Sequence, residues 1–210
     1  MTIDRIVYSV LHGSENVERV ISLISPQVTA KNKVGLEVSE EDLRLYDQIN
    51  ARGLSPQNAE KELLDAIIKK YGYDYSGNEE ELPNPLSAAI FWSNLYNHLK
   101  NSGVEVIGLG SEKRIRLLNH NVDRSYRGAV MYHLIEVLHF DHFLFERILE
   151  YNVDRIIVGC GHAKRISKIT SSNLILVDEL HPRLEQMQEV FEREYRAGQY
   201  GTYSLPDLRD

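Results

Sequence analysis

The sequence is poor in cysteine: Cys160 is its one thiol among 210 residues. A single cysteine excludes a disulfide within the chain, and with it the small secreted domains that disulfides hold together. The first residues also lack a basic segment followed by a long apolar run, so we expect no signal peptide. Both observations favour a reducing compartment, and we expect a cytoplasmic protein.

Long apolar runs and an excess of positive charge are lacking as well. No segment approaches the roughly 18 consecutive apolar residues of a membrane-spanning helix. The 24 basic and 31 acidic residues give a formal net charge of −7, whereas general binding to a nucleic-acid backbone needs a basic surface. We therefore expect neither a nucleic-acid nor a membrane partner, and instead a small-molecule or peptide substrate. Apolar residues make up 42% of the chain, which is typical of a globular protein with a packed core.

Short apolar runs rich in β-branched residues alternate with segments of helical periodicity. The runs predict strands at 4–11, 33–38, 104–108, 154–159 and 173–178. Strands that are separated by helices pair in parallel, with the connecting helices packed against the sheet. The sequence therefore predicts an α/β fold with a mainly parallel sheet and helices on both faces.

The helical segments suggest one domain over 1–210, with a helical insertion at 51–103. Later helices are predicted at 56–71, 85–102, 122–151 and 180–197. Ser14 is the predicted N-cap of the helix that follows the first strand, because a serine hydroxyl accepts a hydrogen bond from a free backbone N–H there. Several large apolar residues in the helix at 85–102 favour a homodimer.

Three polar residues lie where predicted strands end. His12 follows the first strand, Glu37 lies near the end of the second, and His162 follows the fourth. In a parallel sheet the ligand crevice lies outside the carboxyl ends of the strands, so these residues should meet at one edge. Glu37 is the most informative of the three, because a carboxylate in an apolar strand is costly to bury unless it is paired or coordinated.

These three side chains allow two kinds of chemistry. Two imidazoles and a carboxylate suit a divalent metal ion such as zinc, manganese or cobalt, which could activate a water molecule for hydrolysis. The same side chains without a metal could transfer protons. A purely structural role, as a cap or hydrogen-bonding group, is the alternative for each histidine.

The motif Gly159-x-x-His162, together with Glu37, resembles the TraB/Tiki-like superfamily, which includes pheromone-shutdown proteins, Tiki proteases and erythromycin esterases. That family also has a Gly-x-x-His motif at the end of its first strand. Here His12 is present, but Ser9 stands where the family has glycine. The resemblance covers most of residues 4–165.

The resemblance implies a hydrolase of the peptidase or esterase type, metal-dependent in some members, with His12, Glu37 and His162 in its site. It also implies an arginine near the start of a later helix, and Arg127 has the better spacing for it, with Arg124 as the alternative. A guanidinium there would hold an anionic group or stabilise developing negative charge. The second hypothesis is a non-catalytic protein of the same fold that binds or senses a small molecule or metal, which the departure at Ser9 favours.

Overall fold

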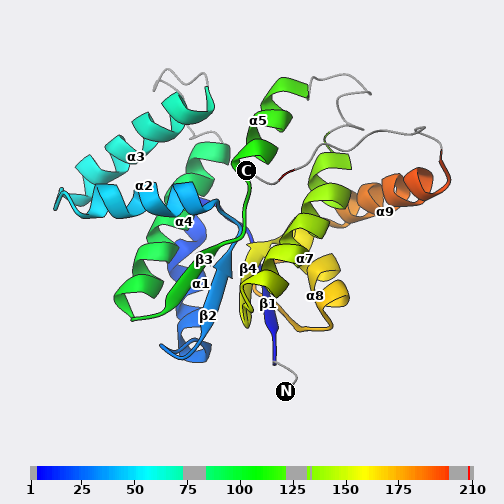
Figure 1. The fold of residues 1–210 in the computed structure, drawn as a ribbon, viewed down its shortest axis with the longest axis horizontal. Coiled ribbons are helices and arrows are strands. Elements are labelled where there is room, and N and C mark those ends of the chain that lie inside the picture. The colour runs from blue at the N-terminus through cyan, green and yellow to red at the C-terminus, as the bar shows by residue number, and fades with distance from the viewer. Residues whose placement is uncertain (1–3, 73–83, 122–131, 133, 199–207, 209–210) are drawn as a thin grey trace.

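A parallel sheet forms the centre of the protein, and the chain alternates between its strands and the surrounding helices (Figure 1). The computed structural model describes residues 4–72, 84–121, 132, 134–198 and 208. Five strands pair in the order β3-β2-β4-β1-β5, every pair parallel. They are β1 (Ile6–Val10), β2 (Lys33–Leu36), β3 (Glu105–Gly108), β4 (Arg155–Gly159) and β5 (Asn173–Leu176). This arrangement confirms the predicted α/β class and its parallel sheet.

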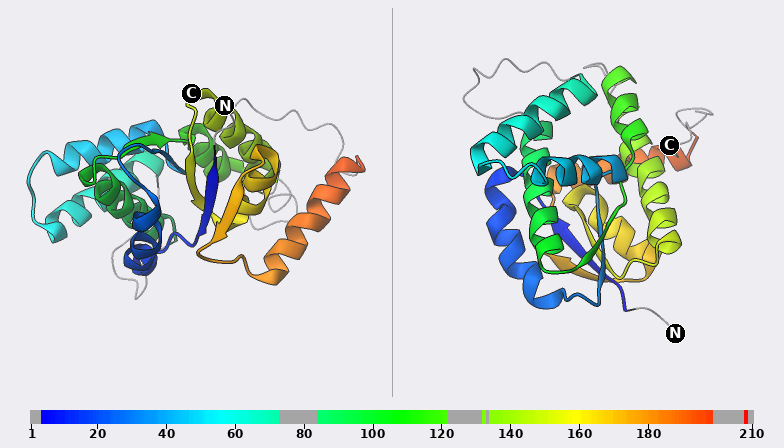
Figure 2. Two further views of the ribbon diagram at one scale, coloured as in Figure 1. Left: turned by 90° about the horizontal axis from the view of Figure 1, so that it is seen from below. Right: turned by 60° about the vertical axis from the view of Figure 1, so that its left-hand side comes forward.

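Helices cover the sheet from both sides (Figure 2). In chain order they are η1 (Ser14–Asn16), α1 (Val17–Ile24), η2 (Ser25–Gln27), α2 (Glu40–Asn50), α3 (Pro56–Tyr71), α4 (Asn84–Asn101), α5 (Glu112–Asn121), the π-helix η3 (Leu134–His139), α7 (Phe140–Glu150), α8 (Cys160–Thr170) and α9 (Pro182–Arg196). No described helix is both long and apolar enough to cross a membrane.

Successive side chains of β1 point to opposite faces of the sheet, and each face has its own hydrophobic core. Tyr8 packs with α1 and α4 on one face, and Val7 packs with α7 and α8 on the other. Both side chains are fully buried. A strand buried on both faces has a continuous apolar sequence instead of an alternating one, and this continuity is the pattern from which the strands were predicted.

Two expectations about helix starts were wrong. Ser14 does not cap α1: its backbone N–H donates instead to the Ser87 hydroxyl of α4, and the chain enters α1 through the short 3-10 helix η1. Helix α5 was not predicted, because a loop was expected up to the helical region at 122–151. The Ser111 hydroxyl accepts the N–H of Arg114 at 3.2 Å, and acidic Glu112 in the first turn suits the helix dipole. This signal was present in the sequence.

Helix α4 lies within the range predicted as an insertion, yet its large side chains are part of the core on the α1 side of the sheet. Phe91, Trp92 and Leu95 are at most 5% exposed. They therefore pack inside this chain, and they do not form the exposed face on which the homodimer prediction depended. That prediction stays untested.

Candidate functional site

A cavity of about 1010 Å³ opens at the carboxyl ends of β1, β2 and β4, which are neighbours in the sheet. His12, Glu37 and Gly159 line it from the residues that end or follow these strands. Helices α4, α5 and α9 contribute to its walls. The topology therefore brings together residues that are far apart in the sequence, at the edge where parallel α/β proteins bind ligands.

Glu37 lies at the centre of the floor of this cavity. Its Oε2 accepts the N–H of Gly159 at 2.7 Å, and its Oε1 lies 3.3 Å from Nη1 of Arg114 and 3.5 Å from Nε2 of His162. Burial alone would raise its pKa, but the positive charges of His162 and Arg114 lower the pKa to about 2. Glu37 is thus a fixed anion held between two cations.

His162, in the first turn of α8, is enclosed by carboxylates. Its Nδ1 lies 2.7 Å from Oδ1 of Asp141, and its Nε2 lies 3.4 Å from Oε2 of Glu136. Burial alone would lower its pKa, but Glu37 and Asp141 outweigh burial and raise the pKa to about 10. His162 is therefore an imidazolium at neutral pH, with both ring nitrogens donating.

Two arginines complete the cluster of charges. Nε of Arg114 lies 3.3 Å from Oε1 of Glu136, and its guanidinium lies 3.6 Å from the centre of the Phe140 ring. Nε of Arg165 pairs with the second oxygen of Asp141. The charges of Arg114, Arg165 and imidazolium His162 thus balance three carboxylates, which is what a stable buried charge cluster requires.

His12 differs from the other members because it is exposed. Its ring lies 5.8 Å from that of Trp92 between centroids, and both residues line the cavity. A Cβ atom added to Gly159 would lie 3.1 Å from Nε2 of His12 and 3.2 Å from Oε2 of Glu37. The glycine therefore leaves room for an imidazole and a carboxylate to approach the same point.

The structure brings His12, Glu37 and His162 to one cavity, as the sequence predicted. Arg124 and Arg127 lie outside the described residues, and among the described arginines the one that contacts Glu37 is Arg114. Sequence reasoning missed Arg114 because the helix that carries it was not predicted. It also missed the carboxylates that surround His162, because nothing in their sequence context marks them as facing the sheet edge.

The fit of a metal ion to these residues can be judged from the donors. Within the part of the chain that the structure describes, no group of three or more histidine, cysteine, aspartate or glutamate side chains is arranged to hold one. His162 would have to lose a proton, and Glu37 and Glu136 are already paired with the guanidinium of Arg114. The donor set fits a metal ion poorly, so metal dependence stays a prediction and no step below depends on it.

Comparison of the chain with protein families, with curated proteins and with solved structures found no match in any of the three. The fold and the site therefore define the class of protein by themselves. It is a parallel α/β protein with a compensated charge cluster below a large cavity at the carboxyl edge of its sheet.

Proposed function

We propose that the protein is a hydrolase that cleaves an ester or amide bond of a small molecule or peptide held in this cavity. The observation that carries the proposal is that an exposed histidine and a group of buried charges lie together at the floor of the cavity. His12 is exposed to the cavity, whereas Glu37 beside it is a fixed anion flanked by the cations Arg114 and His162. A base near an anion, next to buried positive charge, is what hydrolysis of a carbonyl compound needs.

His12 is the proposed general base. It takes a proton from a water molecule as the water oxygen bonds to the carbonyl carbon, and the π electrons of the carbonyl move to its oxygen. Glu37 stabilises the imidazolium that forms on His12, since Gly159 lets both groups approach one point. The tetrahedral intermediate then collapses, the bond to the leaving group breaks, and His12 returns the proton to that group.

Arg114 and His162 are the proposed electrostatic partners of the oxyanion. Both line the cavity, and both keep their positive charge at neutral pH. Preorganised charge of this kind contributes more to catalysis than the same charge in solution.

The resemblance to the TraB/Tiki-like superfamily supports the same proposal. The arginine of the resemblance is Arg127 or Arg124, which lie outside the described residues, whereas Arg114 of α5 is the described arginine that pairs with Glu37. Glu37 and His162 lie together at the site, as the resemblance implies. Some members of that group resemble metal-dependent peptidases, and dependence of this protein on zinc, manganese or cobalt is a separate prediction.

One observation favours the second candidate, a protein that binds or senses a ligand without turnover. His162 keeps its proton well above neutral pH and is therefore a poor general base. Among the three site residues predicted from the sequence, hydrolysis then depends on His12 as the base, whereas ligand binding needs no base at all.

A panel of p-nitrophenyl esters and p-nitroanilides, assayed with the wild-type protein and with His12→Asn, tests the proposal. We expect wild-type turnover and a fall in kcat/KM of about 10²–10⁴ in His12→Asn, the usual contribution of a general base. His142→Asn is the matched control, because that histidine is on the surface of α7 in an ion pair with Glu146.

The results distinguish a hydrolase from a binding protein. Turnover that His12→Asn leaves unchanged contradicts the assigned base, and ligand binding without turnover of any substrate supports the binding protein instead. Addition of a chelator and then of zinc, manganese or cobalt decides metal dependence. Loss of turnover with the chelator and its return with one metal would support the metal hypothesis.

A further inference from the structure

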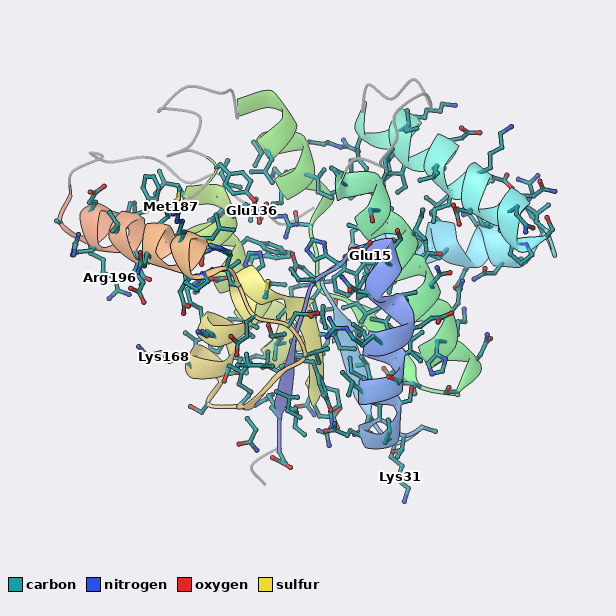
Figure 3. All side chains as sticks on the ribbon, turned by 180° about the vertical axis from the view of Figure 1, so that it is seen from behind. Glu15, Lys31, Glu136, Lys168, Met187 and Arg196 are labelled. Atoms are coloured by element: carbon teal, nitrogen blue, oxygen red, sulfur yellow. The ribbon has the colours of Figure 1, made fainter. Side chains whose placement is uncertain are left out.

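Helix α9 forms the outer wall of the cavity and presents apolar side chains to it. Leu184 and Met187 line the cavity, yet they are 49% and 52% exposed. None of the described residues of α9 is buried. Figure 2 shows α9 set apart from the sheet, on the side of β5. In Figure 3, Met187 and Glu136 lie in the upper part of the view, and Lys31 lies at the bottom. Leu184 and Met187 therefore form an apolar surface that stays about half exposed.

Polar contacts hold α9 in this position. Lys164 of α8 pairs with Glu185 at 2.6 Å, and Arg165 donates to Oε1 of Gln188 at 2.9 Å. Farther along the chain, Leu208 is buried in the core and its carbonyl accepts the Ser111 hydroxyl at 2.8 Å. These contacts attach the helix beside the cavity, while Leu184 and Met187 stay about half exposed.

The opposite wall is apolar as well. Trp92 and Ala88 of α4 and Ile115 and Leu118 of α5 line the cavity. The volume of about 1010 Å³ is at the upper end of what small-molecule sites enclose, roughly 300–1000 Å³. A cavity with two apolar walls and a charged floor suits an amphipathic molecule.

We propose that the substrate or ligand carries a flexible acyl chain, which lies between α9 and the α4–α5 wall while its carbonyl head reaches the floor beside His12 and Arg114. The head chemistry rests on the proposed hydrolase, but the binding of the chain does not. Covering Leu184 and Met187 removes apolar surface from water and so favours binding.

An acyl chain fits these walls better than an extended peptide does. Among the described residues of α9 that line the cavity, Gln188 is the polar one, and its amide oxygen already accepts from Arg165. Leu184 and Met187 offer a peptide backbone no hydrogen-bonding group, so its N–H and C=O groups gain nothing from this wall. An acyl chain has no such groups.

Trp92 provides a direct test, because it is the single tryptophan of the chain and lines the cavity. Titration of the protein with sodium acetate, octanoate and decanoate, followed by Trp92 fluorescence, reports on occupancy without any turnover. We expect decanoate to bind most tightly and acetate to produce no saturable change.

A matched pair of variants locates the chain. Leu184→Gln should weaken decanoate binding about fivefold, which corresponds to about half of the burial free energy of a leucine side chain. Leu149→Gln on α7 is the control, because Leu149 is similarly exposed, at 47%, and does not line the cavity. Both positions are on the surface, so neither substitution should prevent folding.

The outcomes separate this inference from the proposed hydrolase. Chain-length-dependent binding without ester turnover would support the acyl site and contradict the hydrolase. Turnover of p-nitrophenyl esters at a rate independent of acyl length, without a fluorescence response to decanoate, would overturn the acyl site alone. An equal loss of decanoate binding in Leu184→Gln and Leu149→Gln would overturn it too.

Discussion

Replacement of Glu37 by glutamine tests the charge cluster most directly. The substitution keeps the size of the side chain and an oxygen for the N–H of Gly159, but it removes the charge shared by Arg114 and His162. The pKa of Glu37 falls from 4.5 to about 2 on folding, which corresponds to about 3 kcal/mol of stability at neutral pH. For a chain of this size that loss lowers Tm by about 6–12 °C.

Urea unfolding at neutral pH measures this loss, with Glu192→Gln as the control. Glu192 forms an ion pair with Arg196 on the surface of α9, and such pairs contribute at most about 0.5 kcal/mol. NMR titration of the His162 ring adds a second readout, whose pKa should fall from about 10 because Glu37 is a main cause of its rise. Equal stability of the two variants, with an unchanged His162 titration, would refute the assigned cluster.

Two further predictions concern pH and space at the site. The raised pKa of His162, about 10 against 6.5, stabilises the fold fully below about pH 6.5, and this contribution is lost as the pH rises toward 10. Urea midpoints should therefore fall between about pH 6 and pH 9, and His162→Asn should flatten that slope; a wild-type protein without the slope would contradict the ion pairing. Gly159→Ala places a methyl group 3.1 Å from Nε2 of His12, whereas Gly161→Ala meets Gln188 at an ordinary 3.5 Å. Gly159→Ala should lower kcat/KM at least about tenfold relative to Gly161→Ala, and equal activity would place the reaction elsewhere.

The central strands β1, β2 and β4 were predictable because burial on both faces leaves a continuous apolar signal. The structure keeps all five strands, each ending within two residues of its predicted end. The start of α1 was harder to predict, since it depends on a partner from a distant segment. The Ser87 hydroxyl, which takes the N–H of Ser14, lies on a different helix and is invisible to local reasoning.

The residues of the site also divide into those that could be predicted from the sequence and those that could not. His12, Glu37 and His162 were predictable, because topology alone brings the ends of parallel strands together. Glu136 and Asp141 were not, because their approach to His162 depends on how η3 and α7 pack against α8. No sequence spacing encodes that packing.

The charge cluster and the walls of the cavity should respond differently to substitution. Each carboxylate of the floor contacts at least one cation, so the loss of Glu37 or Asp141 leaves the buried cluster with a net positive charge and affects stability and chemistry together. The outer wall carries half-exposed apolar side chains, so Leu184→Gln should change affinity while the free energy of unfolding stays within about 0.5 kcal/mol of wild type. What the protein binds can therefore change at α9 without disturbing the floor, and the chemistry cannot change at Glu37 without disturbing the fold.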